Sequence, residues 1–107
     1  MNQKIFHKKI YTSSIILNTI QQNGSILKGM GVQKIGLFGS YQRGSARTES
    51  DMDFLIKMDH PTFDKYMDVK IFLEDLFNCK IDLVLEDSLK PRLIPYILEE
   101  VVYATGL

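Results

Sequence analysis

Two short segments of this chain alternate acidic and apolar residues, and this alternation constrains the fold more than any other feature. In DMDFLIK, Asp51 and Asp53 are separated by an apolar residue, and in KIDLVLED, Asp82 is flanked by apolar residues. Because successive side chains of a β-strand point to opposite faces, each segment has one apolar face and one acidic face. We therefore predict strands over 51–57 and 79–85 whose apolar faces join a common core.

The remaining segments predict helices around a third strand. QKIGLF predicts a buried strand over 33–38. Apolar residues at helical spacing, with capping and breaking residues between them, predict the helices. These cover 13–22, 25–30, 40–46, 62–77 and 91–102. The expected fold class is therefore α/β (α+β), a small mixed sheet of about three strands flanked by helices.

The length of 107 residues predicts a single domain over 1–107. Residues 1–10 are assigned only as an N-terminal extension, which either lengthens the first helix or stays loose. No apolar run approaches the roughly 20 residues that cross a bilayer, and the N-terminus has no secretory-signal pattern. We expect a cytoplasmic protein without membrane contact.

The composition excludes several classes of site. One cysteine, Cys79, cannot form an intrachain disulfide, and with only two histidines a zinc site of Cys/His type is not expected. Neither His7 nor His60 lies in the sequence context of a nucleophilic hydrolase. The net charge is zero and no stripe of basic and aromatic residues occurs, so direct nucleic-acid binding is not expected.

The charges are unevenly distributed along the chain. Residues 1–48 hold seven of the 13 Lys and Arg residues and no acid, whereas residues 49–107 hold all 13 acids. Two solvated faces that partly neutralise one another would explain this distribution. A phosphate-accepting first half beside a metal-binding second half would explain it equally well, so both interpretations stay open.

Three carboxylates converge if the two acid-bearing strands are neighbours. Asp51, Asp53 and Asp82 would then repel one another unless a cation lay between them. Hard oxygen ligands of this kind suit Mg²⁺ that is held together with substrate phosphates. Two ions at such a site would stabilise the attacking and leaving oxygens of a phosphoryl-type transfer. We therefore predict a magnesium site, with two ions, at these three residues.

Gly39-Ser40 lies where the strand over 33–38 passes into a helix. The backbone N–H groups at a helix start are free to bind an anion, glycine lets a phosphate approach the backbone, and the serine hydroxyl adds a donor. A tight turn with a capping serine has the same sequence. The junction alone therefore leaves a phosphate site and a structural turn as alternatives.

Taken together, these motifs resemble a known family. Gly39-Ser40, ten intervening residues, Asp51-Met52-Asp53 and a later strand with Asp82 form the signature of the nucleotidyltransferase superfamily related to DNA polymerase beta. The stretch GLFGSYQRGSARTESDMDFLI closely resembles the minimal nucleotidyltransferases, the MNT family of bacterial and archaeal antitoxins. KIDLVLEDSLKPRLIPYILEEVVYA is similar to the end of that family's chains. The resemblance covers about residues 25–104 and implies the nucleotidyltransferase fold.

The resemblance also implies a role for each matching residue. Gly39 and Ser40 would hold the β- and γ-phosphates of ATP. Asp51 and Asp53 would coordinate two Mg²⁺ ions. Asp82 would ligate the second ion and help to deprotonate the attacking hydroxyl, which displaces pyrophosphate from the α-phosphorus.

Arg43 and Gly44 match the Arg-Gly pair of the family. Arg43 would either contact phosphate or tie the loop down, and the sequence leaves the two roles equal. The chain departs from the family at Gln42, where alanine is more common, and at Met52, where isoleucine is usual. Both changes are tolerable, because the first lies on the loop surface and the second is still apolar.

The family implies a partner as well. Its antitoxins transfer AMP from ATP to a tyrosine of a HEPN-domain toxin, a ribonuclease. We expect no separate acceptor domain in a chain of this length, so a partner or a homo- or hetero-oligomer would have to supply the acceptor. Protein adenylylation is the leading prediction. A steric antitoxin without turnover and nucleotidyl transfer to a small molecule stay open as alternatives.

Overall fold

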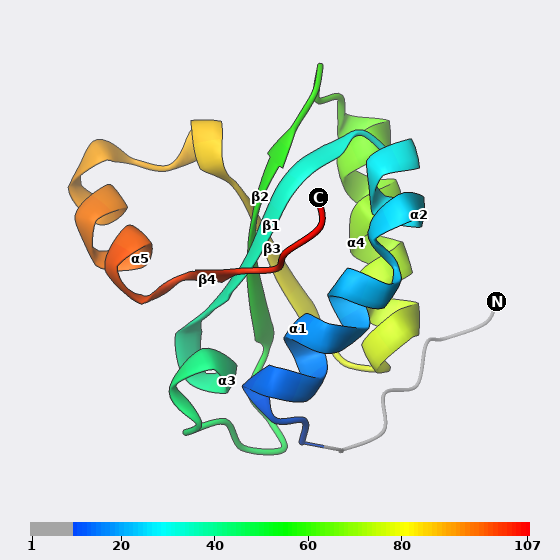
Figure 1. The fold of residues 1–107 in the computed structure, drawn as a ribbon. Helices are drawn as coiled ribbons and strands as arrows, with labels where there is room; N and C mark the ends of the chain where they lie inside the picture. The colour runs from blue at the N-terminus through cyan, green and yellow to red at the C-terminus, as the bar shows by residue number, and fades with distance from the viewer. Residues whose placement is uncertain (1–9) are drawn as a thin grey trace, which may run out of the picture.

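A four-stranded mixed sheet forms the centre of the computed structural model, which describes residues 10–107 (Figure 1). Its strands are β1 (Val32–Phe38), β2 (Met52–Met58), β3 (Ile81–Leu85) and β4 (Val102–Tyr103), in the order β3-β2-β1-β4. β1 is antiparallel to β2 and β4, whereas β2 and β3 are parallel. The acid-bearing strands β2 and β3 are therefore neighbours, as the predicted carboxylate cluster requires.

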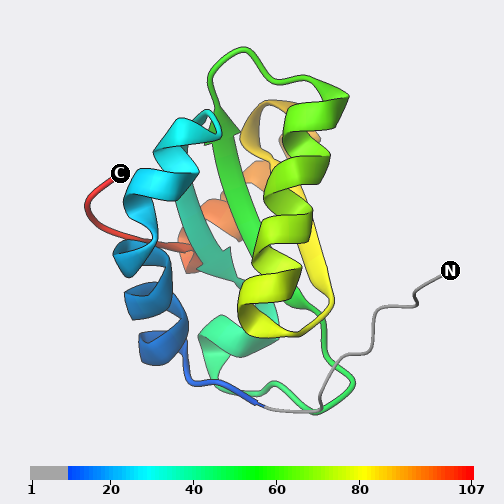
Figure 2. The same cartoon turned by 90° about the vertical axis from the view of Figure 1, so that its right-hand side faces the viewer.

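Helices cover one face of this sheet. Figures 1 and 2 show α1 (Ser13–Gln22), α2 (Gly24–Gly29) and α4 (Phe63–Phe77) on that face, with α5 (Ile94–Glu100) on the opposite side. α4 connects the parallel strands β2 and β3, which a tight turn could not join. The predicted α/β (α+β) fold class is confirmed.

The core lies between the helical layer and the sheet. Ile16 and Ile20 of α1, Val69 and Leu73 of α4, and Phe54 of β2 are all fully buried there. The alternation predicted for β2 holds, because every second residue of the strand is an apolar residue of this core, which leaves the acid of the strand on the other face. The sheet thus presents its carboxylates on the side away from α1, α2 and α4.

The C-terminal segment differs from the prediction. A helix was expected over 91–102, but a short 3₁₀ turn, Pro91–Leu93, leads into α5, which ends at Glu100. Val101 is extended (φ −67°, ψ 136°), and the next two residues form β4 against β1. Valine and tyrosine favour a strand once an edge is available to pair with. The sheet therefore has a fourth strand beyond the expected three.

Gly36 explains how β4 can lie so close to β1. A Cβ atom at Gly36 would stand 2.6 Å from Cγ2 of Val101 and 3.0 Å from Cδ1 of Tyr103. Only glycine, which has no side chain, leaves room for β4 to pair with β1 at this position.

The structure also bears on the predicted helix over 40–46, the N-terminal extension and the expected absence of a membrane span. α3 (Gly39–Arg43) is shorter than the predicted helix over 40–46, because Gly44 adopts a left-handed conformation (φ 77°) that ends it. The N-terminal extension over 1–10 lies almost entirely outside the described residues. Between residues 10 and 107, no helix has both the length and the apolar character needed to span a membrane.

Candidate functional site

The predicted site residues meet at one end of the sheet, on the face away from the core. β1 ends at Phe38, which pairs with Asp53 of β2, and Asp53 in turn pairs with Asp82 of β3. Asp51 directly precedes β2, and Gly39 begins α3 directly after β1. The strand register alone therefore brings the glycine and the carboxylates together.

Asp53 lies at the centre of this arrangement. Burial raises the pKa of its carboxyl from 3.8 to about 7. The neighbouring carboxylate of Asp82, which also shares a hydrogen bond with it, and the charge of Asp51 add to the effect, whereas the Arg43 guanidinium opposes it. Both other predicted acids thus disfavour ionisation of Asp53, which holds its proton up to a pH close to neutral.

These acids fit a divalent cation in their chemistry. Among residues 10–107, no group of three or more His, Cys, Asp or Glu side chains is already arranged to hold a metal ion. Mg²⁺ does not require such a cage, because one or two carboxylates together with substrate phosphates and water commonly hold it. Asp53 and Asp82 are the adjacent pair, and Asp51 is the third carboxylate. The magnesium site stays a prediction.

Gly39 is in direct contact with the acid cluster. Its φ of 77° lies in the left-handed region, and a Cβ atom added there would overlap the carboxylate of Asp53. Glycine is therefore required for two reasons, the backbone conformation and the closeness of Asp53. Ser40 follows at the start of α3, partly exposed. The structure thus places the predicted phosphate-binding turn against the predicted metal-binding carboxylate.

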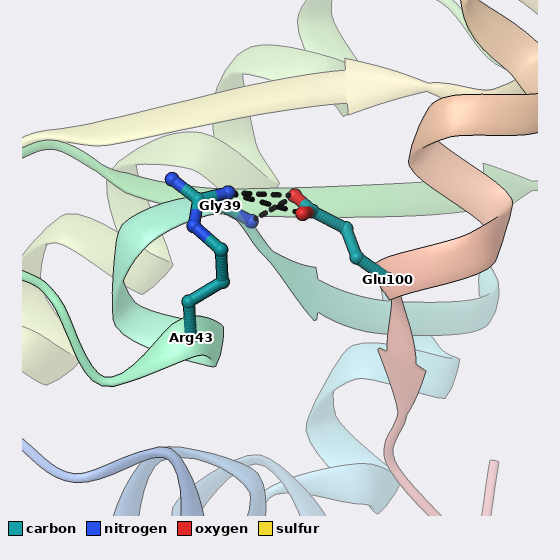
Figure 3. A network of polar contacts seen from close by, with 3 residues as sticks. All are labelled: Gly39, Arg43 and Glu100. Carbon is teal, nitrogen blue, oxygen red and sulfur yellow. Dashed lines mark hydrogen bonds and ion pairs between the residues drawn. The ribbon is translucent and has the colours of Figure 1, made fainter.

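A residue that the sequence analysis did not assign to the site, Glu100, completes the turn (Figure 3). The backbone N–H of Gly39 donates a hydrogen bond of 2.8 Å to Oε1 of Glu100. Nη1 of Arg43 donates to Oε2 at 3.0 Å and to Oε1 at 3.2 Å, and the two side chains form an ion pair. Of the two roles left open for Arg43, this contact supports tying the loop down.

The arrangement suits one kind of ligand. Backbone donors at a strand-to-helix turn attract an anion, and the adjacent carboxylates attract a cation. A triphosphate carried with a divalent cation satisfies both requirements in a single ligand.

Comparisons with known proteins agree with this chemistry. A family model described as a nucleotidyltransferase domain matches residues 14–104. Protein adenylyltransferase MntA of Thermococcus cleftensis is 42% identical over 74 residues, covering 68% of this chain and 75% of that protein. A protein of Methanocaldococcus jannaschii, provisionally named as a protein adenylyltransferase, is 34% identical over 97 residues, covering 86% of this chain and 97% of its own.

Solved structures share the fold. A provisionally named minimal nucleotidyltransferase superposes with a TM-score of 0.75 at 29% identity, covering 86% of this chain and 95% of its own. A chain from the complex of a tri-AMPylated Shewanella oneidensis HEPN toxin with an MNT antitoxin has a TM-score of 0.63 at 20% identity, covering 90% and 74% of the two chains. Since the family model spans residues 14–104, this chain belongs to the nucleotidyltransferase domain family.

Proposed function

We propose that this chain is a metal-dependent protein adenylyltransferase that acts as an antitoxin. It would transfer AMP from ATP to a tyrosine hydroxyl of a HEPN-type toxin. The tyrosine oxygen forms a bond to the α-phosphorus, the bond from that phosphorus to the bridging oxygen breaks, and pyrophosphate leaves. One observation carries the proposal: the Asp53 carboxylate lies against Gly39, where no Cβ atom fits.

Each site residue has a separate role in this proposal. The turn at Gly39-Ser40 would receive the β- and γ-phosphates. Asp51, Asp53 and Asp82 would hold the cation, which supplies positive charge to the phosphate oxygens. Asp82 is exposed at the strand edge and can accept the proton of the incoming hydroxyl. All of these groups lie at the same end of the sheet.

The partner is supported by similarity. The relative from Thermococcus cleftensis is named as a protein adenylyltransferase, and one of the similar folds comes from a complex with an AMP-modified HEPN toxin. Asp82 on the edge strand β3 is exposed, so a protein side chain can approach the carboxylates from outside.

The proposal is tested by following the label from ATP. Purified chain, Mg²⁺ and a candidate HEPN toxin are incubated with ATP labelled either at the α- or at the γ-phosphorus. We expect stable label on the toxin from α-labelled ATP only, and none after chelation with EDTA. Asp68→Asn, on the exposed surface of α4, is the matched control for Asp53→Asn and should transfer label normally. Label from γ-labelled ATP would indicate a kinase and contradict the proposal.

A second candidate, a steric antitoxin, is supported by α5. None of its residues is buried, and Tyr96 and Leu98 are 72% and 45% exposed. Exposed apolar side chains on one short helix provide a surface for a partner whether or not transfer occurs. If the chain silences the toxin equally well with Asp53→Asn, the steric function is the correct one.

A further inference from the structure

Glu100 holds the turn between β1 and α3 from a distant part of the chain. Its carboxylate accepts the Gly39 N–H at 2.8 Å and binds the Arg43 guanidinium through both oxygens, at 3.0 and 3.2 Å (Figure 3). Gly39 is buried, and the side chains of Arg43 and Glu100 are 53% and 30% exposed. Gly39 is thus enclosed by two carboxylates, Asp53 at its α-carbon and Glu100 at its N–H.

The strand register determines where Glu100 lies. β4 is antiparallel to β1, with Val102 opposite Leu37 and Tyr103 opposite Gly36. Continued by two residues, the same register places Glu100 opposite Gly39. The backbone therefore delivers this carboxylate to the turn.

We propose that Glu100 is a positioning residue of the nucleotide-binding turn: by holding the Gly39 N–H and the Arg43 guanidinium, it sets the conformation in which the turn receives a triphosphate. The inference rests on the proposed function and adds a residue to it. Glu100 acts through Arg43 and the backbone and does not contact the nucleotide. The phosphates are then bound by the donors that follow Gly39, beginning with Ser40.

Charge favours positioning over displacement by the nucleotide. A triphosphate that took over the Gly39 N–H would have to expel the Glu100 carboxylate. Because β4 tethers Glu100 within reach, the expelled carboxylate would still face both the phosphates and Asp53, and like charges at that distance repel. With the ion pair intact, Arg43 neutralises Glu100, and the turn presents its remaining donors to the anion.

The first test measures nucleotide affinity by calorimetry with a non-hydrolysable ATP analogue and with AMP, both in the presence of Mg²⁺. Glu100→Gln should weaken binding of the analogue about tenfold, as loss of a charge-assisted contact implies. Binding of AMP, which lacks the phosphates that the turn receives, should be unchanged. Glu99→Gln, on the exposed side of α5, is the matched control and should bind like the wild type.

A double-variant comparison tests whether Glu100 acts through Arg43. Arg43→Ala should cause a similar loss, and Glu100→Gln combined with Arg43→Ala should bind no more weakly than Arg43→Ala alone. Wild-type affinity of Glu100→Gln for the analogue would overturn the inference. Tighter binding would do the same, because it would identify Glu100 as a competitor of the phosphates.

Amide hydrogen exchange at Gly39 tests independently whether Glu100 holds the Gly39 N–H. Loss of the acceptor in Glu100→Gln should accelerate exchange of the Gly39 amide, whereas Glu99→Gln should leave it unchanged. Unaltered exchange would refute the holding role. A different result would refute the proposed function instead: the wild-type chain binds no triphosphate, although Glu100→Gln still accelerates exchange of the Gly39 amide. The failure of the inference and the failure of the proposed function are therefore distinguishable.

Discussion

Asp53 combines partial burial with two acidic neighbours, and this makes it the residue whose ionisation costs the metal-free fold most. Its pKa of about 7 lies above the ordinary value of 3.8 because of burial, Asp82 and Asp51, in that order. A carboxyl in this state favours a cation or a proton beside it. The surroundings of this one residue therefore favour binding of a cation.

This pKa predicts how stability depends on pH in the metal-free protein. Below pH 3.8 the Asp53 carboxyl is protonated in both the folded and unfolded states. Between that value and about 7 only the folded state keeps the proton, so its contribution to the free energy of unfolding falls as pH rises.

Urea denaturation in EDTA at pH 4.5 and 8 checks this prediction. Asp53→Asn should gain stability relative to the wild type at the higher pH, because other titrating groups are common to both proteins and cancel in the difference. An equal difference at both pH values would contradict the assignment.

Three glycines with different surroundings predict a graded series of stability losses. Gly39→Ala combines a left-handed backbone with overlap on Asp53 and should cost about 2 kcal/mol or more. Gly44→Ala has the same φ of 77° but open space, and should cost about 1 kcal/mol. Gly29→Ala meets nothing within 4 Å in a helix and should be neutral or slightly stabilising. Chemical denaturation ranks them, and equal costs at Gly39 and Gly44 would argue against the Asp53 contact.

At the scale of elements, local pattern predicted most of the fold. The alternation in DMDFLIK predicts which face of β2 joins the core, because each apolar side chain in the pattern has a partner layer to bury it. The helix over 62–77 was predicted from apolar residues at helical spacing, among them Phe63, but Phe63 is 75% exposed and Phe77 is buried. A first-turn residue can reach past the edge of the core, and sequence spacing does not reveal this.

β4 could not be predicted in the same way. Two residues carry no periodicity of their own, and Val102–Tyr103 becomes a strand only because β1 offers an edge. Glu100 was missed for a related reason: 61 residues separate it from Gly39. Contacts at that separation are a product of the whole topology. The glycine, the serine and the three aspartates, by contrast, belong to motifs of fixed spacing.

Gly36→Ala tests whether β4 carries Glu100 to the turn. The added methyl group would stand 2.6 Å from Val101 and 3.0 Å from Tyr103, so β4 must shift or detach. We expect a lower melting temperature together with faster amide exchange at Gly39. Faster exchange at β4 with an unchanged Gly39 amide would show that Glu100 reaches the turn without β4.

At the scale of the whole molecule, the basic first part and the acidic second part of the sequence meet at the candidate site. The proposed phosphate-binding turn comes from the acid-free first 48 residues, and the carboxylates come from the acidic remainder. The sheet joins the two halves at one end, which supports the functional interpretation of the distribution. In the C-terminal half, exposed acids such as Asp87 and Glu99 give the molecule an acidic surface, whereas Glu86 is partly buried and Glu100 is paired with Arg43.

This acidic surface predicts how a basic partner associates. Charge complementarity accelerates encounter, and salt screens it. The association rate with a HEPN-type toxin should therefore fall as ionic strength rises, while the dissociation rate changes less. Stopped-flow mixing over a range of salt concentrations measures both. An association rate independent of salt would show that apolar contacts, such as Tyr96 and Leu98 of α5, govern the encounter.

The central claim is that this chain transfers a nucleotide to a protein by means of its carboxylates. Intact-mass spectrometry of a HEPN-type toxin co-expressed with the chain tests it most directly. The account predicts that the toxin gains the mass of AMP on tyrosine with the wild-type chain, and no added mass with Asp51→Asn or Asp53→Asn. A toxin that is silenced without added mass, and equally by Asp53→Asn, would contradict the account and identify a steric antitoxin.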